Sequence, residues 1–153
     1  MRRKDKQITD NQKIEEILRK GRLCHIAMAD RNEPYIVTVN YGYSDSAIYF
    51  HSASEGKKID WLRKNPRVCF MIYIDDELVD GENPCRDWSM KYKSVIGYGH
   101  AYLIDNLAEK EIGFNVLMSQ YTGQKSFLFD EKNLKETAVI KIDIEEISAK
   151  RSE

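Results

Sequence analysis

Alternating apolar and polar positions divide much of this chain into short β-strands separated by polar turns. The alternation is clearest near the end, where Ile140, Ile142 and Ile144 are interleaved with charged residues. Similar runs rich in tyrosine, isoleucine and valine favour a pleated surface. They predict further strands over residues 22–30, 35–43, 47–51, 67–75 and 91–105. The first three of these, joined by short turns, are typical of an antiparallel meander, and the continuously apolar run 67–75 predicts a strand buried on both faces.

Three other segments carry helical signals. The segment 9–21 has apolar residues on one helical face, and Thr9 with Gln12 has capping-box spacing. A second helix is expected over 106–121, with Ile112 facing inward. The third follows the strand 47–51 directly and ends before the Asn-Pro pair at 65–66.

Two stretches depart from regular patterns. Residues 75–90 show no clear period, which predicts a long loop of the kind that is usually functional or mobile. Within the strand 91–105, Gly97 and Gly99 share one face with Val95 and Ala101. Paired glycines inside a strand indicate a bulge, or close approach by another backbone or a ligand.

The elements together favour a mainly β fold with peripheral helices. About six strands occur, helices are inserted between them, and the regular βα alternation of a doubly wound sheet is missing. Many strands with short turns favour a closed or partly closed antiparallel barrel, which leaves few bare edges. We find no internal repeat or linker, so a single domain is expected.

Composition limits the classes of function. The chain has 153 residues, 42% of them hydrophobic and 32% charged, as expected for a globular protein. A net charge of −1 argues against a general nucleic-acid binder. No apolar run approaches membrane-spanning length, and the start of the sequence lacks the apolar stretch of a signal peptide, so a cytoplasmic protein is expected. The three widely spaced cysteines are interpreted as reduced thiols.

The stretch "YFHSASEGKKIDWLRKNP", from Tyr49 to Pro66, contains the strongest candidate chemistry. Hydroxyls, a glycine, Lys57 and Lys58 gather where a strand passes into a helix. Ser52 and Glu55 fit a capping box, which would start the helix near Ser52. Backbone N–H groups at a helix start, small residues and two ammonium groups form a phosphate site on physical grounds. The alternative is an ordinary helix cap with two solvated lysines.

The histidines and cysteines do not show a metal-binding spacing. His25, His51 and His100 lie far apart, and no C-x-x-C or H-x-x-x-H pattern occurs, so no metal is expected. His51 lies at the strand end beside the proposed phosphate site. It could contact a ligand or act as a proton donor, and we favour the wall of a cofactor site over a catalyst. No catalytic residue is identified from the sequence.

Two longer motifs resemble a known family. The segment "GRLCHIAMADRNEPYIVTVNYGYSDSAIYFHSASEGKKIDWLRKNPRVCF" is similar to the pyridoxamine 5′-phosphate oxidase-like flavin-binding split barrels, in particular to the branch grouped with 5-nitroimidazole antibiotic resistance proteins. The segment "WSMKYKSVIGYGHA" resembles the second signature of that branch. The order of elements agrees from about residue 10 to 147. The resemblance implies a six-stranded antiparallel split β-barrel of Greek-key type, a homodimer, and FMN in a cleft between the subunits.

The resemblance also implies positions for the cofactor. The segment 37–39 would pass beside the isoalloxazine ring through its backbone, the segment 51–53 would line the flavin, and two lysines would hold the 5′-phosphate. Two residues of the later loop and strand, from the same subunit or its partner, would border the cleft. The implied cofactor-binding residues are Val37, Thr38, Val39, His51, Ser52, Ala53, Lys57, Lys58, Trp88 and Ser94. The expected organisation is one FMN-binding domain over residues 1–153, with a helix at about 9–21 and a barrel at about 22–148.

Two classes of function follow from this resemblance. The first is an FMN-dependent oxidoreductase that reduces a small organic acceptor, with a nitro compound suggested by the resemblance alone. Oxidation of pyridoxamine phosphate is a weaker interpretation, because the ending "EEISAKRSE" lacks the arginine-rich substrate-binding end of the true oxidases. The second is a non-catalytic module that stores or carries flavin or haem on the same barrel. No residue identifies the substrate.

Overall fold

The computed structural model describes residues 3–152, and β-strands dominate it. The strands are β1 (Gln7–Ile8), β2 (Cys24–Asp30), β3 (Glu33–Val39), β4 (Gly42–Ser44), β5 (Ala47–Ala53), β6 (Arg67–Val79), β7 (Ser89–Ile104) and β8 (Thr137–Ser152). The helices are the 3₁₀ turn η1 (Lys4–Lys6), α1 (Asn11–Lys20), α2 (Lys57–Lys64), α3 (Pro84–Asp87), α4 (Leu107–Thr122) and α5 (Glu131–Glu136).

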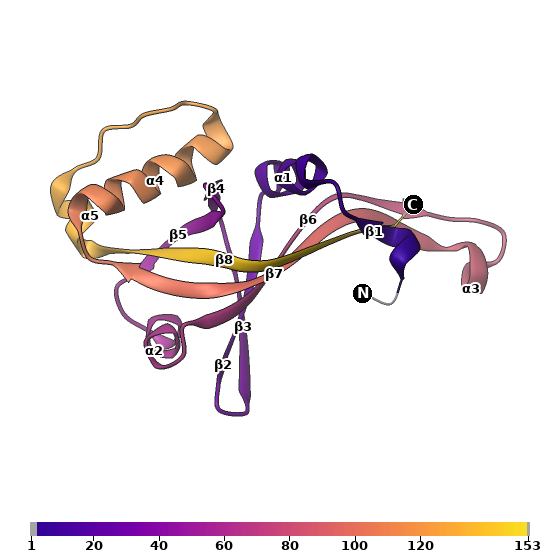
Figure 1. Cartoon of the computed structure of the whole chain (residues 1–153), viewed down its shortest axis with the longest axis horizontal. Helices are drawn as coiled ribbons and strands as arrows, with labels where there is room; N and C mark the ends of the chain where they lie inside the picture. Colours follow the sequence, from indigo (N-terminus) through magenta and orange to yellow (C-terminus); the bar gives the residue numbers. More distant parts are fainter. Residues whose placement is uncertain (1–2, 153) are drawn as a thin grey trace.

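The strands form one antiparallel sheet whose path runs β3-β2-β6-β7-β8-β5-β4, with β1 paired to β8. This path ends at β3 on one side and at β4 on the other, so the curved sheet remains split between these ends. The long strands β7 and β8 cross the whole molecule, and α4 with α5 lies over one end of them (Figure 1). The predicted fold class, a mainly β antiparallel barrel with peripheral helices, is confirmed, with eight strands in place of six.

The predicted meander of three strands is confirmed in its two antiparallel pairings, β2 with β3 and β4 with β5, but its middle strand is broken in two. β3 and β4 are separate strands that lie at opposite ends of the sheet, whereas residues 35–43 were expected to form one strand. The chain crosses the core between them at Tyr41, which is fully buried. The Tyr41 hydroxyl donates to the carbonyl oxygen of Leu18 at 2.6 Å, and its backbone N–H donates to the Tyr121 hydroxyl at 2.8 Å. These bonds satisfy the polar groups of a crossing segment that has no strand partner.

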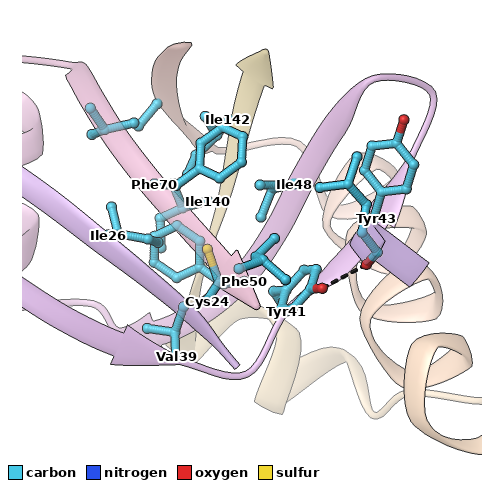
Figure 2. Packing of buried hydrophobic residues seen from close by; sticks show 14 of the residues in the cluster. Cys24, Ile26, Val39, Tyr41, Tyr43, Ile48, Phe50, Phe70, Ile140 and Ile142 are labelled. Atoms are coloured by element: carbon cyan, nitrogen blue, oxygen red, sulfur yellow. Dashed lines mark hydrogen bonds between the residues drawn. The ribbon is translucent and has the colours of Figure 1, made fainter. Parts of the chain in front are cut away.

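The core fills the space enclosed by the curved sheet. Ile26, Phe50, Phe70 and Ile140 are essentially inaccessible and come from four different strands (Figure 2). The apolar faces of α1 and α2 add further buried side chains to the same cluster: Ile17, Leu18, Ile59, Trp61 and Leu62. The inward-facing positions of the predicted strands therefore do form one core.

The strand β6 differs from its prediction in two ways. Its residues alternate between buried and exposed, so only one face is buried, and Met71 and Tyr73 remain exposed on the other. It also continues to Val79 and pairs with β7 as a projecting hairpin arm where a loop over 75–90 was expected. The arm escaped prediction because both of its faces are largely exposed, and a strand that buries neither face shows no alternation.

The glycine pair in β7 confirms the predicted bulge and close approach. The register between β7 and β8 shifts between Tyr98 and Gly99. A Cβ atom on Gly99 would lie 2.1 Å from the carbonyl oxygen of Asp143, and one on Gly97 would lie 2.3 Å from the Phe70 ring. Both sites therefore require glycine for space.

The boundaries of α1 and α4 are close to those predicted, although two details change. Asp10, not Thr9, caps α1, because its side chain accepts a hydrogen bond from the backbone N–H of Gln12. Asn106 caps α4 as expected, but Ile112 points outward and is 58% exposed. Among residues 3–152, none of the helices has both the length and the apolar character needed to cross a membrane.

Candidate functional site

The junction between β5 and α2 is shaped by a glycine, not by the predicted capping box. Ser52 and Ala53 still belong to β5, where they pair with β8, and α2 begins only at Lys57. The N-cap residue is Gly56, whose φ of 112° is readily adopted only by glycine, and no side chain caps the helix. The prediction that Ser52 starts the helix is wrong, because the ladder with β8 extends past it.

Lys57 extends from α2 across the split towards β3. Its Nζ atom lies 4.6 Å from the ring centroids of both Tyr35, on β3, and Trp61, on α2. These two rings meet edge to face with centroids 5.3 Å apart. The ammonium group thus contacts two aromatic rings, and no carboxylate of residues 3–152 forms an ion pair with it.

Lys58 points to the β5 side of the junction. Its Nζ atom lies 5.7 Å from the Phe50 ring centroid, and burial lowers the pKa of its ammonium group. Burial, and secondarily the charge of Lys58, also lowers the pKa of His51. Two basic groups, the half-buried Lys58 and the exposed His51, therefore lie close together where β5 ends, which is an environment that an anion would stabilise.

The segment 37–39 turns its side chains to different faces. Val37 and Val39 pack against the core, while Thr38 faces outward. The Thr38 hydroxyl oxygen lies 3.0 Å from Nδ1 of His25, and the His25 ring stacks on Tyr73 with centroids 6.0 Å apart. A cofactor beside this segment would meet backbone and Thr38, since the valine side chains are occupied in the core.

Ser94 and Trp88 lie on the arm side of the molecule. Ser94 is buried and stands opposite Tyr73 in the β6–β7 ladder, so it shares the outward face with Thr38. Trp88 is 49% exposed, and its indole N–H donates to the carbonyl oxygen of Gly81 at 3.0 Å. Figure 1 shows α3, next to Trp88, at the far end of the molecule from α2. A single chain therefore does not bring Trp88 to the lysines.

The outward face of the sheet carries a set of exposed apolar side chains. We call it the outer sheet patch, and its members are Ile36, Met71, Tyr73, Ile96 and Tyr98. They come from β3, β6 and β7, and Met71 lies directly opposite Ile96. Exposed apolar side chains gathered on one face are typical of interaction sites in soluble proteins.

Several aromatic residues near the site were missed by sequence reasoning. Phe114 on α4 lies 5.7 Å from the His51 ring, and Phe129 lies 5.4 Å from Phe114. Phe127 continues this row at 6.3 Å from Phe129. The available signal was the apolar triplet 127–129 within an otherwise polar stretch.

Groups of metal-ligating side chains do not occur in the described part of the chain. Within residues 3–152, no three His, Cys, Asp or Glu side chains are placed to hold one metal ion. His100 instead pairs with Glu145 at 2.6 Å. The functional side chains around the junction are therefore lysines and aromatic rings.

A split antiparallel barrel with a cationic junction at one end of the split defines the class of protein, and comparison with known families agrees. The profile of the pyridoxamine 5′-phosphate oxidase family matches residues 10–151, so the chain belongs to this family. A curated relative, an uncharacterised protein of Rhizobium meliloti (strain 1021), is 32% identical over 65 residues. That match spans 42% of this chain and 42% of the relative.

Two solved structures share the fold over most of the chain. A proposed 5-nitroimidazole antibiotic resistance protein from Bacteroides thetaiotaomicron is 28% identical, with a TM-score of 0.84 over 95% of this chain and 86% of that one. An FAD and heme binding protein from Mycobacterium smegmatis is 18% identical, with a TM-score of 0.86 over 97% of this chain and 74% of that one. At this identity the second likeness concerns the fold alone.

Proposed function

We propose that this protein binds FMN and that Lys57 and Lys58 hold the 5′-phosphate of the cofactor. The observation that carries the proposal is the pair of ammonium groups at the first turn of α2. Burial lowers the pKa of Lys58, and no carboxylate within residues 3–152 forms an ion pair with it. Partial burial of a cation without a counter-ion is costly, and a bound phosphate would offset that cost. The helix start adds N–H groups directed at the same anion.

The rest of the cofactor would lie along the outward face. The backbone of Val37, Thr38 and Val39 would border the isoalloxazine ring, and residues 51–53 would line its other side. The flavin would supply the hydride chemistry, and the protein would supply position and electrostatics. Likeness to the Bacteroides protein supports a small organic acceptor, with a nitro compound as the first class to test.

We further propose a homodimer that completes the site. The outer sheet patch offers an apolar surface for a second copy of the chain. Pairing through this face would bring the partner subunit's Trp88 towards the cleft, which one chain alone cannot do. Sedimentation of the purified protein tests this directly, since a monomer that still binds FMN tightly contradicts an interface site.

The identity of the cofactor is tested by purifying the protein, recording its visible absorption and determining the mass of any cofactor released on denaturation. The proposal predicts flavin absorption bands and the mass of FMN, present as purified or after incubation with FMN. A protein that stays colourless after this incubation contradicts it, as does release of FAD or a haem Soret band. Oxidation of NAD(P)H with and without acceptors then tests turnover, and the proposal of an oxidoreductase fails if no acceptor accelerates it.

A further inference from the structure

A hollow of about 520 Å³ lies beside His51, on the side where α4 and α5 cover the ends of β5 and β8. We call it the aromatic cavity. The residues that line it are His51, Phe114, Leu128, Phe129, Asp130, Asn133, Leu134 and Thr137. They come from two strands, two helices and the segment between those helices, so the cavity is formed only by the folded chain.

One wall of the cavity is a row of rings. His51, Phe114 and Phe129 follow one another with centroid separations of 5.7 and 5.4 Å, and successive planes are tilted by 36°. Rings at these separations and tilts can accept another flat ring in an offset or edge contact.

Leu128 lines the same cavity with a fully exposed side chain. It lies between two phenylalanines that are each partly buried. When an apolar ligand covers an exposed apolar side chain beside a cavity, the free energy of the complex is lowered. Phe127 and Phe129 are partly buried against the protein, whereas Leu128 between them is left for a ligand to cover.

The walls are fixed in place by hydrogen bonds. The backbone N–H of Phe127 donates to the Asn115 side chain at 2.8 Å, which holds the segment before Leu128 against α4. The buried ammonium group of Lys110 donates to the carbonyl oxygens of Leu134 and Thr137 at 3.1 and 2.9 Å, which holds α5. A cavity with fixed walls loses little conformational entropy when a ligand binds.

The polar groups of the lining favour a ligand with no net charge. Asp130 carries a carboxylate, while the ammonium group of Lys58 lies near enough to His51 to lower the pKa of that imidazole. The Asp130 carboxylate accepts a hydrogen bond from the Asn133 backbone, so it is already engaged. A neutral imidazole offers one donor and one acceptor, which leaves His51 as a partner for a polar substituent.

We infer that the aromatic cavity binds a small, planar, uncharged aromatic molecule whose hydrogen-bonding substituent faces His51. Its further identification as the substrate site rests on the proposed function, because His51 would then stand between the flavin and this ligand.

Binding of benzamide, compared with its saturated counterpart cyclohexanecarboxamide, tests the inference. Both are titrated into the 153-residue protein, with amide shifts followed by nuclear magnetic resonance. We expect shifts centred on His51 and residues 114 and 127–137, and benzamide binding about 3- to 10-fold tighter, because a ring pair adds to simple burial. Equal affinities, or shifts elsewhere, would overturn the inference.

Variants locate the binding site and separate it from the flavin. Phe129→Ala is expected to weaken benzamide binding about 3- to 10-fold. Leu128→Ser should weaken it too, and it avoids any question of folding because this side chain is fully exposed. Ile112→Ser, an exposed apolar residue of α4 outside the cavity, is the matched control. Unchanged affinity in both cavity variants overturns the inference. The affinity of both cavity variants for FMN is expected to equal that of the wild type. If the wild-type protein does not bind FMN at all, the proposed function is refuted, but the result for benzamide still stands.

Discussion

Lys57 and Lys58 are adjacent in sequence but have different surroundings. Lys57 lies over the faces of Tyr35 and Trp61, whereas Lys58 is partly buried near His51. One ammonium group therefore lies on the β3 side of the split and the other on the β5 side. Lys57 is exposed and Lys58 is half-buried, and we propose that a phosphate is held between them.

Replacing both lysines, Lys57→Ala with Lys58→Ala, is expected to weaken FMN binding by about 2 to 4 kcal/mol. Each charge-assisted contact contributes about 1.5 to 3 kcal/mol, and water recovers part of the loss. Quenching of flavin fluorescence measures the affinity. Lys135→Ala, a change of an exposed lysine on α5, is the control. Affinity equal to that of the wild type in the double variant would show that the phosphate lies elsewhere.

His51 makes stability depend on pH. Its pKa in the folded protein is lowered from 6.5 by burial and by Lys58, so the unfolded chain binds its proton more readily. The contribution of neutral His51 is therefore present above pH 6.5 and is lost as the pH falls through the lowered folded pKa. Urea unfolding at pH 7.5 and at pH 5.5 should show a smaller loss of stability in His51→Asn than in the wild type. An identical loss in both proteins would contradict this role.

The strands β6 and β8 illustrate how far alternation predicts an element. The alternating isoleucines of β8 were placed correctly, since one face of that strand meets the core. β6 shows a similar alternation of buried and exposed residues up to Ile74. Beyond the core the alternation ends, because neither face of the strand is buried there. Sequence periodicity reports burial, so it predicts strands only where burial is one-sided.

A substitution of Gly99 tests whether the bulge in the pairing of β7 with β8 requires glycine. Gly99→Ala would place a Cβ atom 2.1 Å from a backbone oxygen, which cannot move without shifting the ladder. We expect a loss of stability of about 1 to 3 kcal/mol, measured by urea unfolding. Ser148→Ala, an exposed change on β8, should be near neutral. A Gly99→Ala protein as stable as the wild type would mean that the bulge tolerates a side chain.

At the scale of the whole molecule, sequence reasoning predicted the fold class and the barrel more fully than the site. The crossing at Tyr41, which sends β4 to the far end of the sheet, depends on contacts with Leu18 and Tyr121 that no local pattern reveals. The two lysines could be proposed from the sequence because they are adjacent and lie at one strand–helix junction. The position of Trp88 has no local sequence signal, and α3, which Trp88 follows, lies far from α2 in a single chain (Figure 1).

The outer sheet patch gives a prediction for assembly. Met71→Glu with Ile96→Glu places two charges at directly opposed positions on β6 and β7. In the proposed dimer these charges would be buried, so we expect a monomer by sedimentation and a loss of FMN affinity. Ile112→Glu, a change of an exposed side chain on α4, should leave both unchanged. A dimer that persists with both charges in place would require a different interface.

The most direct test of the central claim compares FMN with riboflavin, which differ only in the phosphate. If the first turn of α2 is a phosphate site, the wild-type protein will bind FMN more tightly by about 2 to 4 kcal/mol, or roughly 30- to 700-fold. That preference should disappear in the double lysine variant. Equal affinity of the wild-type protein for the two flavins would contradict the account.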